Sequence, residues 1–186
     1  MLRRLAPMVA VALAIAGCGT APTDPPPPGT ATSTTTSGTT INLGSVYEHP
    51  CATLTSAQQH QLSLPPQVRE SAGDSTGMCK WSKDDDSNFF LRFDLRSGAL
   101  AEAYKRRGER DPNGDLVWKS FEPGEIRGLP AVVRSFSEVG THCEVIVDAG
   151  NGQGISITGS LLTTLDPKLC DRLVTASEWI VDKARA

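Results

Sequence analysis

The sequence lacks the surplus of basic residues that nucleic-acid-binding domains carry. It has 18 Lys and Arg against 21 Asp and Glu, a formal net charge of −3, so no nucleic-acid partner is expected. Aromatic residues make up only 5% of the 186 residues, whereas Gly and Pro number 17 and 13, which indicates that part of the chain lies outside a packed core. No apolar run reaches the roughly 20 residues that a membrane-spanning helix needs, which argues against a polytopic membrane protein.

The residue patterns that mark common catalytic centres are also missing. No serine stands in a Gly-x-Ser-x-Gly elbow, and the three histidines, His49, His60 and His142, are scattered along the chain. A catalytic triad assembles in space and not in sequence, so a cell-wall hydrolase stays open as an alternative. The residues themselves favour a protein without catalytic activity, and we assign no catalytic residue.

Candidate ligand loops lack the spacing that metals or phosphates require. No Cys-x-x-Cys or Cys-x-His pair is present, which argues against zinc. The oxygen-rich segments 84–88 and 111–115 do not match the twelve-residue calcium loop, so we interpret them as solvated loops. The glycine-rich segment 150–154 lies between two predicted strands, which favours a tight hairpin turn over a phosphate-binding loop. We therefore expect no metal and no cofactor.

The N-terminus has the pattern of a bacterial secretory signal. Arg3 and Arg4 precede an apolar stretch at residues 8–16, which is too short to span a membrane. This stretch ends in the sequence IAGC at Cys18, which resembles a lipobox. In that pattern the signal peptide, residues 1–17, is removed and the Cys18 thiol is acylated, for example with palmitate; two or three acyl chains anchor a protein stably. The alternative is an ordinary signal peptide with an incidental cysteine. We expect a lipid-anchored protein on the extracytoplasmic face of the cell membrane.

Residues 18–45 differ sharply in composition from the rest of the chain. They contain four consecutive prolines, Pro25–Pro28, and residues 30–40 are almost entirely Thr, Ser, Ala and Gly. Without apolar periodicity this segment cannot bury enough surface to offset its ordering entropy, so we predict a disordered tether. O-glycosylation of its threonines is a compatible alternative. Residues 46–186 then form a single predicted domain of ordinary size.

The five cysteines divide into one anchor and four residues of the domain. With Cys18 acylated, an oxidising compartment leaves Cys51, Cys79, Cys143 and Cys170 free to form disulfides. Four cysteines allow three pairings. We favour Cys51–Cys79 and Cys143–Cys170, which close separate loops in the two halves of the domain.

Hydrophobic periodicity predicts an α+β domain, an antiparallel sheet of about five or six strands packed with helices. A capping box at Thr55 and Gln58 predicts the first helix, which ends near Leu62. Ser97 is expected to cap the second helix, which ends at Arg107. Asp166 is expected to cap the third helix, which carries apolar residues from Leu169 to Ala184. One predicted strand begins at Cys79. The other five predicted strands cover residues 89–95, 116–121, 131–136, 142–149 and 154–162.

Two features of the predicted domain supply candidate binding residues. Lys105, Arg106 and Arg107 form a basic cluster near a predicted helix end, where cations complement the helix dipole. Contact with anionic phospholipid headgroups is the functional alternative for this cluster. Trp81 follows Cys79 closely and is expected to pack against a disulfide and the sheet; its functional alternative is a ligand platform.

Several short motifs follow one another in a distinctive order along the domain. They are Pro50-Cys51, Leu54-Thr55, Cys79-Lys80-Trp81, Gly128-Leu129-Pro130-Ala131, Cys143-Glu144-Val145-Ile146-Val147 and Cys170. Together with the lipobox and the tether, they resemble a family of actinobacterial envelope lipoproteins of unknown function, which includes many mycobacterial lipoproteins. The resemblance covers about residues 46–184. It implies a lipid-anchored extracytoplasmic location and a fold similar to the Mog1/PsbP-like arrangement, and it supplies no catalytic residues.

The anchor, the tether and the lack of a concentrated polar motif favour a non-enzymatic binding or accessory module of the cell envelope. Its expected partner is another envelope protein or a small ligand. A carrier of lipids or other hydrophobic ligands is the first alternative, and it requires a cavity between sheet and helices large enough for acyl chains. The hydrolase is the second alternative, and it requires a cleft that brings a histidine together with a carboxylate and a hydroxyl.

Overall fold

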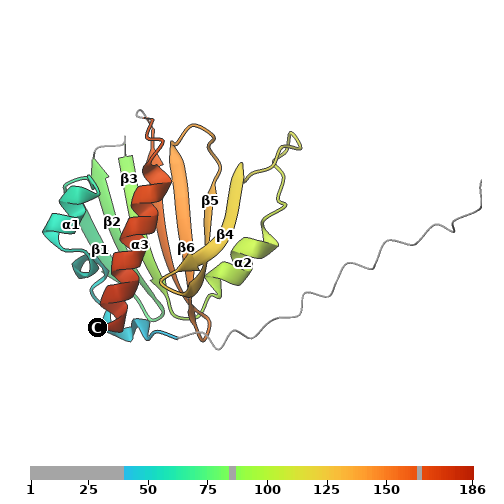
Figure 1. The fold of residues 1–186 in the computed structure, drawn as a ribbon. Coiled ribbons are helices and arrows are strands. Elements are labelled where there is room, and N and C mark those ends of the chain that lie inside the picture. Colours follow the sequence, from blue (N-terminus) through green and yellow to red (C-terminus); the bar gives the residue numbers. More distant parts are fainter. Residues whose placement is uncertain (1–39, 84–86, 163–164) are drawn as a thin grey trace, which may run out of the picture. The chain divides into compact units, whose positions relative to one another are not determined.

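A seven-stranded antiparallel sheet forms the centre of the domain. The computed structural model describes residues 40–83, 87–162 and 165–186, and the strands follow the order β1-β2-β3-β7-β6-β5-β4 across the sheet (Figure 1). The strands are β1 (Gln67–Ala72), β2 (Thr76–Lys83), β3 (Ser87–Asp94), β4 (Ser120–Ile126), β5 (Leu129–Ser135), β6 (His142–Gly150) and β7 (Gln153–Leu161). This confirms the predicted α+β class with an antiparallel sheet, and it corrects the strand count from five or six to seven.

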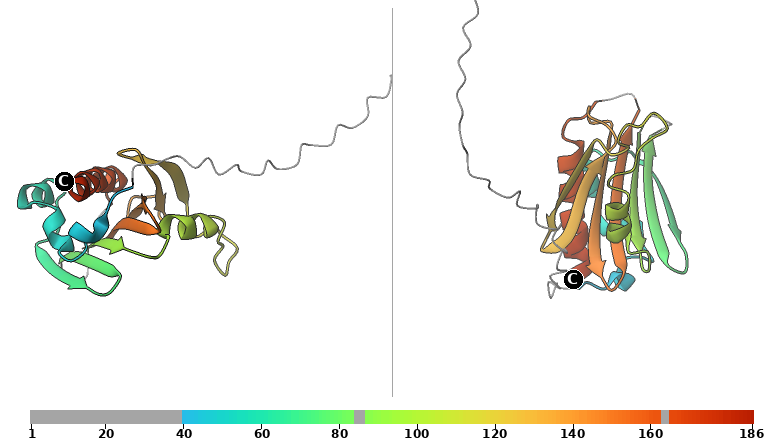
Figure 2. Two further views of the ribbon diagram at one scale, coloured as in Figure 1. Left: turned by 90° about the horizontal axis from the view of Figure 1, so that it is seen from below. Right: turned by 90° about the vertical axis from the view of Figure 1, so that its right-hand side faces the viewer.

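The helices lie on both faces of this sheet. The long helix α3 (Leu169–Arg185) packs across one face, beside α1 (Ser56–Gln61) and the short 3-10 turns η1 (Leu43–Ser45) and η2 (Pro50–Thr53) (Figures 1 and 2). Helix α2 (Ala99–Lys105) packs against β6 and β7. It lies on the opposite face, because an added Cβ at Gly154 would meet Ala99 while one at Gly159 would meet Leu169. The two faces are therefore covered very unequally.

The main core lies between α3 and the sheet. Leu173, Ala176 and Ile180 of α3 are fully buried, as are alternate residues of the strands beneath them, such as Phe93 and Ile157. This alternation places other strand residues on the opposite face. There a smaller apolar cluster joins Leu100 and Ala103 of α2 to Val132 and Ile146 of the sheet.

Two disulfides connect the covering layer to the sheet. Cys51–Cys79 joins η2 to β2, and Cys143–Cys170 joins β6 to the first turn of α3. This is the pairing that the sequence favoured. Each bond closes a loop of similar length, with sequence separations of 28 and 27 residues.

Several local predictions agree with the structure. Thr55 and Gln58 form the expected capping box at the start of α1. The apolar stripe of α3 is buried along its length. The segment Gly150–Gly152 turns between β6 and β7, with Asn151 and Gly152 at positive φ (54° and 74°), as the hairpin interpretation requires.

Helix starts and two strands differ from the predictions. Gly98 and not Ser97 occupies the N-cap of α2, because the Gly98 N–H donates to the Gly152 carbonyl (3.1 Å) and sets the turn one residue later. The N-cap of α3 is Lys168. Asp166 instead accepts a hydrogen bond from the Lys168 N–H (2.9 Å) and so closes the turn that precedes the helix.

Strand β4 begins later than the predicted segment 116–121. The Val117 N–H donates to the Glu109 carbonyl, so this part of the chain pairs with its own loop. Strand β1 was not predicted at all. Every residue of β1 is exposed, so it shows no apolar alternation.

The folded domain begins before residue 46. Ile41 and Leu43 are buried in the main core, and the Ile41 N–H donates to the Ala149 carbonyl (3.0 Å). Residues 41–45, which we had assigned to the tether, therefore belong to the domain. Within the described residues, no helix is both long and apolar enough to cross a bilayer.

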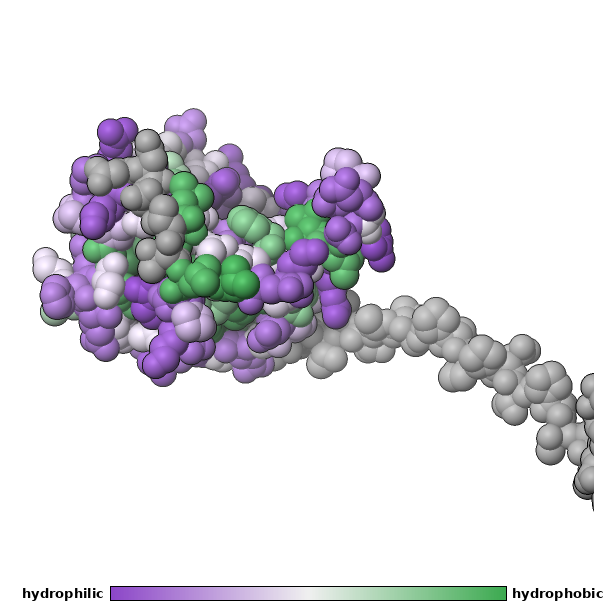
Figure 3. All heavy atoms as spheres, turned by 90° about the horizontal axis from the view of Figure 1, so that it is seen from above, coloured by the Kyte–Doolittle hydropathy of each residue, from purple (hydrophilic) through white to green (hydrophobic). Residues whose placement is uncertain are grey.

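The four most exposed of the large apolar side chains in the described residues lie at one end of the domain. Phe136 and Val139 lie between β5 and β6, and Leu162 and Leu165 lie between β7 and α3. His142 pairs with Ser160, so both connections are at the same end of the sheet. Figure 3 looks at this end and shows apolar surface between polar groups.

Candidate functional site

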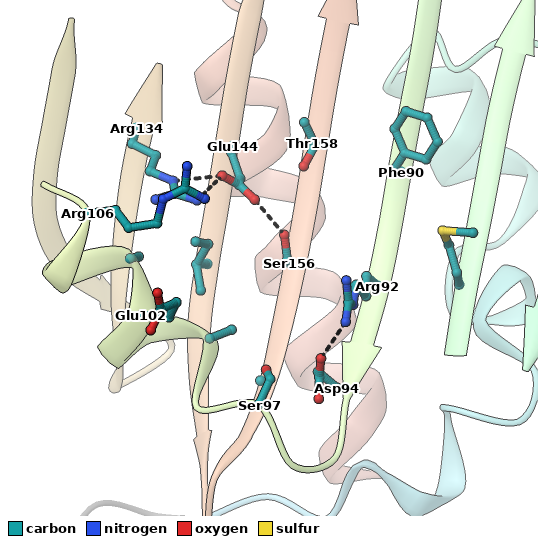
Figure 4. Close-up of a pocket in the computed structure, with 15 residues that line it drawn as sticks. Phe90, Arg92, Asp94, Ser97, Glu102, Arg106, Arg134, Glu144, Ser156 and Thr158 are labelled. Atoms are coloured by element: carbon teal, nitrogen blue, oxygen red, sulfur yellow. Dashed lines mark hydrogen bonds and ion pairs between the residues drawn. The ribbon is translucent and has the colours of Figure 1, made fainter. Parts of the chain in front are cut away.

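A groove of about 390 Å³ lies on the sheet face opposite α3. Its floor comes from strands β2, β3, β5, β6 and β7, and α2 forms one wall (Figure 4). Its polar lining consists of Arg92, Asp94, Ser97, Glu102, Arg106, Arg134, Glu144, Ser156 and Thr158. The groove exists because α2 covers only part of a face on which the strands place polar residues at every second position.

Two ion pairs lie on either side of strand β7 in this groove. On β3, Arg92 Nη2 is 2.8 Å from Asp94 Oδ2. On the other side, Arg134 of β5 faces Glu144 of β6, and both its Nε and Nη2 donate to Glu144 Oε2 at 2.7 Å. The second carboxylate oxygen of Glu144 accepts a hydrogen bond from Ser156 Oγ on β7 (3.0 Å). The floor of the groove is thus a continuous polar network across three neighbouring strands.

Asp94 is ionised at neutral pH although it is buried. Burial on its own raises the pKa of this carboxyl group, but hydrogen bonds from the Arg96 backbone N–H, Ser97 and Arg92 outweigh burial and lower the pKa. The charge of Arg92 adds to this effect. The groove floor therefore carries the charged Asp94 carboxylate beside Arg92, whose side chain is 54% exposed.

The charges that line the groove balance. It contains three arginines and three carboxylates. On the α2 wall, Glu102 pairs with Lys105 (3.3 Å) and Arg106 pairs with Glu109 (2.7 Å). Every ionised group of the lining thus has a partner of opposite sign within the protein, so the groove has no net charge to attract an ion of one sign.

The remaining wall of the groove is apolar. Phe90 of β3 and Met78 of β2 lie at its β2 end; Ala99 and Ala103 of α2 and Ile146 of β6 also line it. Figure 4 shows Phe90 on the far side of the groove from Arg134 and Glu144. The groove therefore offers both polar and apolar surface to a ligand.

A second group of side chains, the Trp118 cluster, contains Trp118, Arg134, Phe136 and His142. The Arg134 guanidinium lies 3.8 Å from the centre of the Trp118 ring, and the His142 ring stacks on Phe136 with centroids 3.6 Å apart. The Trp118 and His142 ring centroids are 6.3 Å apart. Arg134 and His142 are buried, whereas Phe136 is 51% exposed, so the cluster lies just below the surface.

His142 is neutral at physiological pH in this position. Burial lowers the pKa of His142 to about 4. The nearby Glu144 raises that pKa and Arg134 lowers it, so the two charges act in opposite directions. Protonation of His142 would place a second positive charge beside Arg134 without a second carboxylate to balance it.

The structure separates the candidate binding residues predicted from the sequence. Trp81 is fully buried and its Nε1–H donates to Gln59 Oε1 (3.4 Å), so its interpretation as a ligand platform is wrong and the core interpretation is right. Of the basic cluster, Arg106 lines the groove, whereas Lys105 and Arg107 do not. The Arg107 guanidinium instead lies over the Phe121 ring, 5.3 Å from its centroid. Cys18 lies outside the described residues.

The histidines do not come together. His49 and His60 are exposed beside η2 and in α1, whereas His142 is buried on the other face of the sheet. The groove lining contains no histidine. A cleft with a histidine, a carboxylate and a hydroxyl, which the hydrolase alternative required, is therefore not formed by these three residues.

Of the two oxygen-rich segments, the structure describes only residues 111–115 in full. Asp84, Asp85 and Asp86 lie outside the described residues. Asp111 Oδ1 accepts hydrogen bonds from the backbone N–H groups of Asn113 and Asp115, so it stabilises its own turn. Across the described part of the chain, no three His, Cys, Asp or Glu side chains are grouped as metal ligands.

Most groove residues were not singled out from the sequence. Arg92 and Asp94 lie within the predicted strand at residues 89–95 and belong to no motif of their own. Glu144, Ser156 and Thr158 show the same alternation on β6 and β7. The only sequence signal is a polar residue at every second position of three strands. No local pattern predicts the strand order that brings these polar residues together.

Comparison with known proteins gives one match. A family model described as "Protein of unknown function (DUF3558)" matches residues 13–183. No curated protein and no solved structure matches the chain. The match covers the described domain except for its last three residues, and it includes both disulfides.

Proposed function

Because the chain belongs to the DUF3558 family, whose function is unknown, we propose a function from its own geometry: it is a non-enzymatic binding module whose ligand occupies the groove between α2 and the sheet. The observation that carries this proposal is the polar network of Arg92–Asp94 and Arg134–Glu144–Ser156 on the groove floor. Such convergent polar groups beside an apolar wall are typical of small-ligand sites.

The ligand is small, polar and without net charge. The three arginines and three carboxylates of the lining already neutralise one another, so a charged ligand would leave one charge without a partner. Hydroxyl and amide groups both donate and accept hydrogen bonds, and they can join the Arg–carboxylate network without displacing it. Phe90 and Met78 provide the surface for the apolar face of such a ligand. Sugars and short neutral peptides have this chemistry.

The two alternatives fit the geometry less well. A carrier of acyl chains requires space between the helices and the sheet, but Phe93, Ile157 and Leu173 fill that region and are fully buried. The groove has room, but six charged side chains line it. A hydrolase requires a general base beside a nucleophile, but Asp94 and Glu144 already pair with arginines and Glu102 pairs with Lys105.

The proposed location is the extracytoplasmic face of the cell membrane, with Cys18 acylated. The lipobox-like sequence and the Pro/Thr-rich composition of residues 18–40 support it. The two disulfides agree with an oxidising compartment. In this arrangement the protein is an envelope lipoprotein of the actinobacterial type that presents its groove to the envelope.

The groove is tested by ligand binding to the full chain in detergent micelles, measured by thermal denaturation. The probes are neutral mono- and disaccharides and neutral dipeptides, with palmitate as the apolar comparison. We expect a polar probe to raise the midpoint of unfolding. The Thr158→Val variant removes one hydroxyl from the groove and is expected to weaken binding about 5- to 10-fold, the contribution of one hydrogen bond.

The matched control is Thr175→Val, the same change on α3, at a position outside the groove lining. It is expected to bind the probe as the unmodified chain does. If palmitate binds and none of the polar probes does, the proposal is contradicted and the carrier alternative is favoured. Equal weakening by both threonine variants would show that the probe binds elsewhere.

A further inference from the structure

The Trp118 cluster holds three buried side-chain nitrogen atoms without a hydrogen-bond partner. They are Trp118 Nε1, Arg134 Nη1 and His142 Nδ1, and less than 1 Å² of each atom is exposed to solvent. Among the described residues only one further side-chain atom, Arg172 Nε, shares this condition. Folded proteins satisfy nearly all buried polar groups, so three such atoms in one cluster require an explanation.

The unmet requirement is for an acceptor. Trp118 Nε1 and Arg134 Nη1 can only donate, and His142 Nδ1 donates in one of its neutral tautomers. Glu144, the carboxylate nearest to them in the network, is already used: Oε2 accepts from Arg134 Nε and Nη2, and Oε1 accepts from Ser156. The cluster thus lacks oxygen acceptors for three donors, one of which belongs to a guanidinium.

We propose that the Trp118 cluster is a binding site for an oxyanion, a carboxylate or phosphate group, which Arg134 Nη1, His142 Nδ1 and Trp118 Nε1 hold by hydrogen bonds and over which Trp118 closes. An oxyanion presents several acceptor oxygens to donors from different directions, and hydrogen bonds to charged groups are about twice as strong as neutral ones. The anion is an addition to the Arg134–Glu144 pair and leaves both bonds to Glu144 in place.

Trp118 is placed to open and close this site. It stands in the connection between α2 and β4, next to Lys119, whose N–H donates to the Ser135 carbonyl (2.8 Å). Its ring covers the guanidinium, and on the outer side the neighbouring Phe136 is half exposed. Each donor left unpaired in the closed form costs about 1–3 kcal/mol, so the closed form without an anion is less stable than the closed form with one. Rotation of the Trp118 side chain admits the anion, whose oxygens then accept hydrogen bonds from these donors.

This site is distinct from the groove. The charged groups of the groove pair with one another, whereas three donors of the Trp118 cluster have no acceptor, and the two sets of residues share only Arg134. The inference therefore does not depend on the identity of the groove ligand.

The test is an NMR titration of the full chain in detergent micelles, with the indole N–H signals as the readout. The chain has three tryptophans, so three indole signals are expected, and Trp118→Phe assigns the one from Trp118. Sodium acetate, phosphate and sulfate are added against sodium chloride at equal ionic strength. We expect a saturable shift of the Trp118 signal with acetate or phosphate, while the signals of Trp81 and Trp179 stay unchanged. The comparison of acetate with phosphate identifies the class of anion.

The His142→Phe variant separates binding from folding. Phenylalanine keeps the stacking on Phe136 and removes the ring nitrogens, so the fold is retained and the anion affinity is expected to fall about tenfold. His60→Phe, the same change at an exposed position of α1, is the matched control and is expected to leave the affinity unchanged. Three results would overturn the proposal: no shift beyond that caused by chloride, equal shifts of all three indole signals, or a shift that His142→Phe leaves intact. A Trp118 signal that shows exchange with a bound water and no response to anions would assign the missing acceptor to water and also overturn it.

Discussion

Arg134 and Glu144 show how single residues hold the uncovered face of the sheet together. Their side chains are only 9% and 16% exposed, so water contributes little to their solvation. A buried ion pair is stable only when both partners remain, because the removal of one leaves an unpaired charge. Ser156 and Trp118 add a hydrogen bond and a cation–π contact to the pair. The residues that shape the groove therefore also stabilise the sheet.

His142 makes stability depend on pH. Its pKa is about 4 in the folded protein and about 6.5 in the unfolded chain, so the unfolded chain binds the proton more readily between these values. The contribution of neutral His142 is fully present above about pH 6.5 and is lost as the pH falls to about 4. We expect the free energy of unfolding to decrease by up to about 3 kcal/mol across this range, beyond the effect of other groups. Urea unfolding at a series of pH values measures it.

His142→Phe isolates this contribution, because it leaves Glu144 and Arg134, the charged groups that act on the ring, in place. The variant is expected to lose less stability between pH 6.5 and 4 than the unmodified chain. Parallel stability curves for the two proteins would show that His142 does not carry the effect.

At the scale of helices and strands, local chemistry decided what could be predicted. The capping box of Thr55 and Gln58 and the apolar stripe of α3 are local signals, and both helices were found. Strand β1 has no buried residue and β4 contains Pro123, which an edge strand tolerates, so the first was missed and the second was displaced.

The groove could not be predicted for a related reason. Its floor joins Arg92, Arg134, Glu144 and Ser156, which lie on four strands whose order, β3-β7-β6-β5, differs from their order in the chain. Pairing between strands distant in sequence is set by the whole sheet and its core, and no short pattern encodes it. The unpaired atoms of the Trp118 cluster likewise depend on contacts between the α2–β4 connection and two strands.

The two disulfides attach elements to the sheet with loops of nearly equal length. On the chain-entropy account, bonds with separations of 28 and 27 residues stabilise the domain equally, by roughly 3–4 kcal/mol each. We expect Cys51→Ser/Cys79→Ser and Cys143→Ser/Cys170→Ser to lower the free energy of unfolding by similar amounts, measured with urea. A loss below about 1 kcal/mol for either pair would contradict this account, and a large difference between the pairs would assign the stabilisation to local packing.

At the scale of the whole domain, the described chain begins and ends on one side. Residue 40 and Ala186 lie at the same end of the sheet, and the exposed apolar loops lie at the other end (Figure 1). With the anchor at Cys18 that we propose, the chain from the membrane joins the domain at the end where residue 40 lies. The groove lies on the face opposite α3, so α3 does not block it.

The anchor itself is tested by Cys18→Ala in the full chain. Without the thiol no acyl chain can be attached, so the protein is expected to move from the membrane fraction to the soluble fraction. Ser33→Ala, a neutral change in the same N-terminal segment, is the control and is expected to stay with the membranes. A Cys18→Ala protein that remains fully membrane-bound would contradict lipid anchoring at this residue.

The disulfide at Cys51 limits how much of the domain a pulling force on its N-terminal side can unfold. Force transmitted along the N-terminal segment would first break the hydrogen bond between Ile41 and Ala149 and pull η1 from the core. Unravelling would then stop at Cys51, because its covalent bond to Cys79 transfers the load to β2, an inner strand of the sheet. Only residues 41–50 can extend before that point, so a chain held by its N-terminal end can be pulled without losing the sheet that forms its groove.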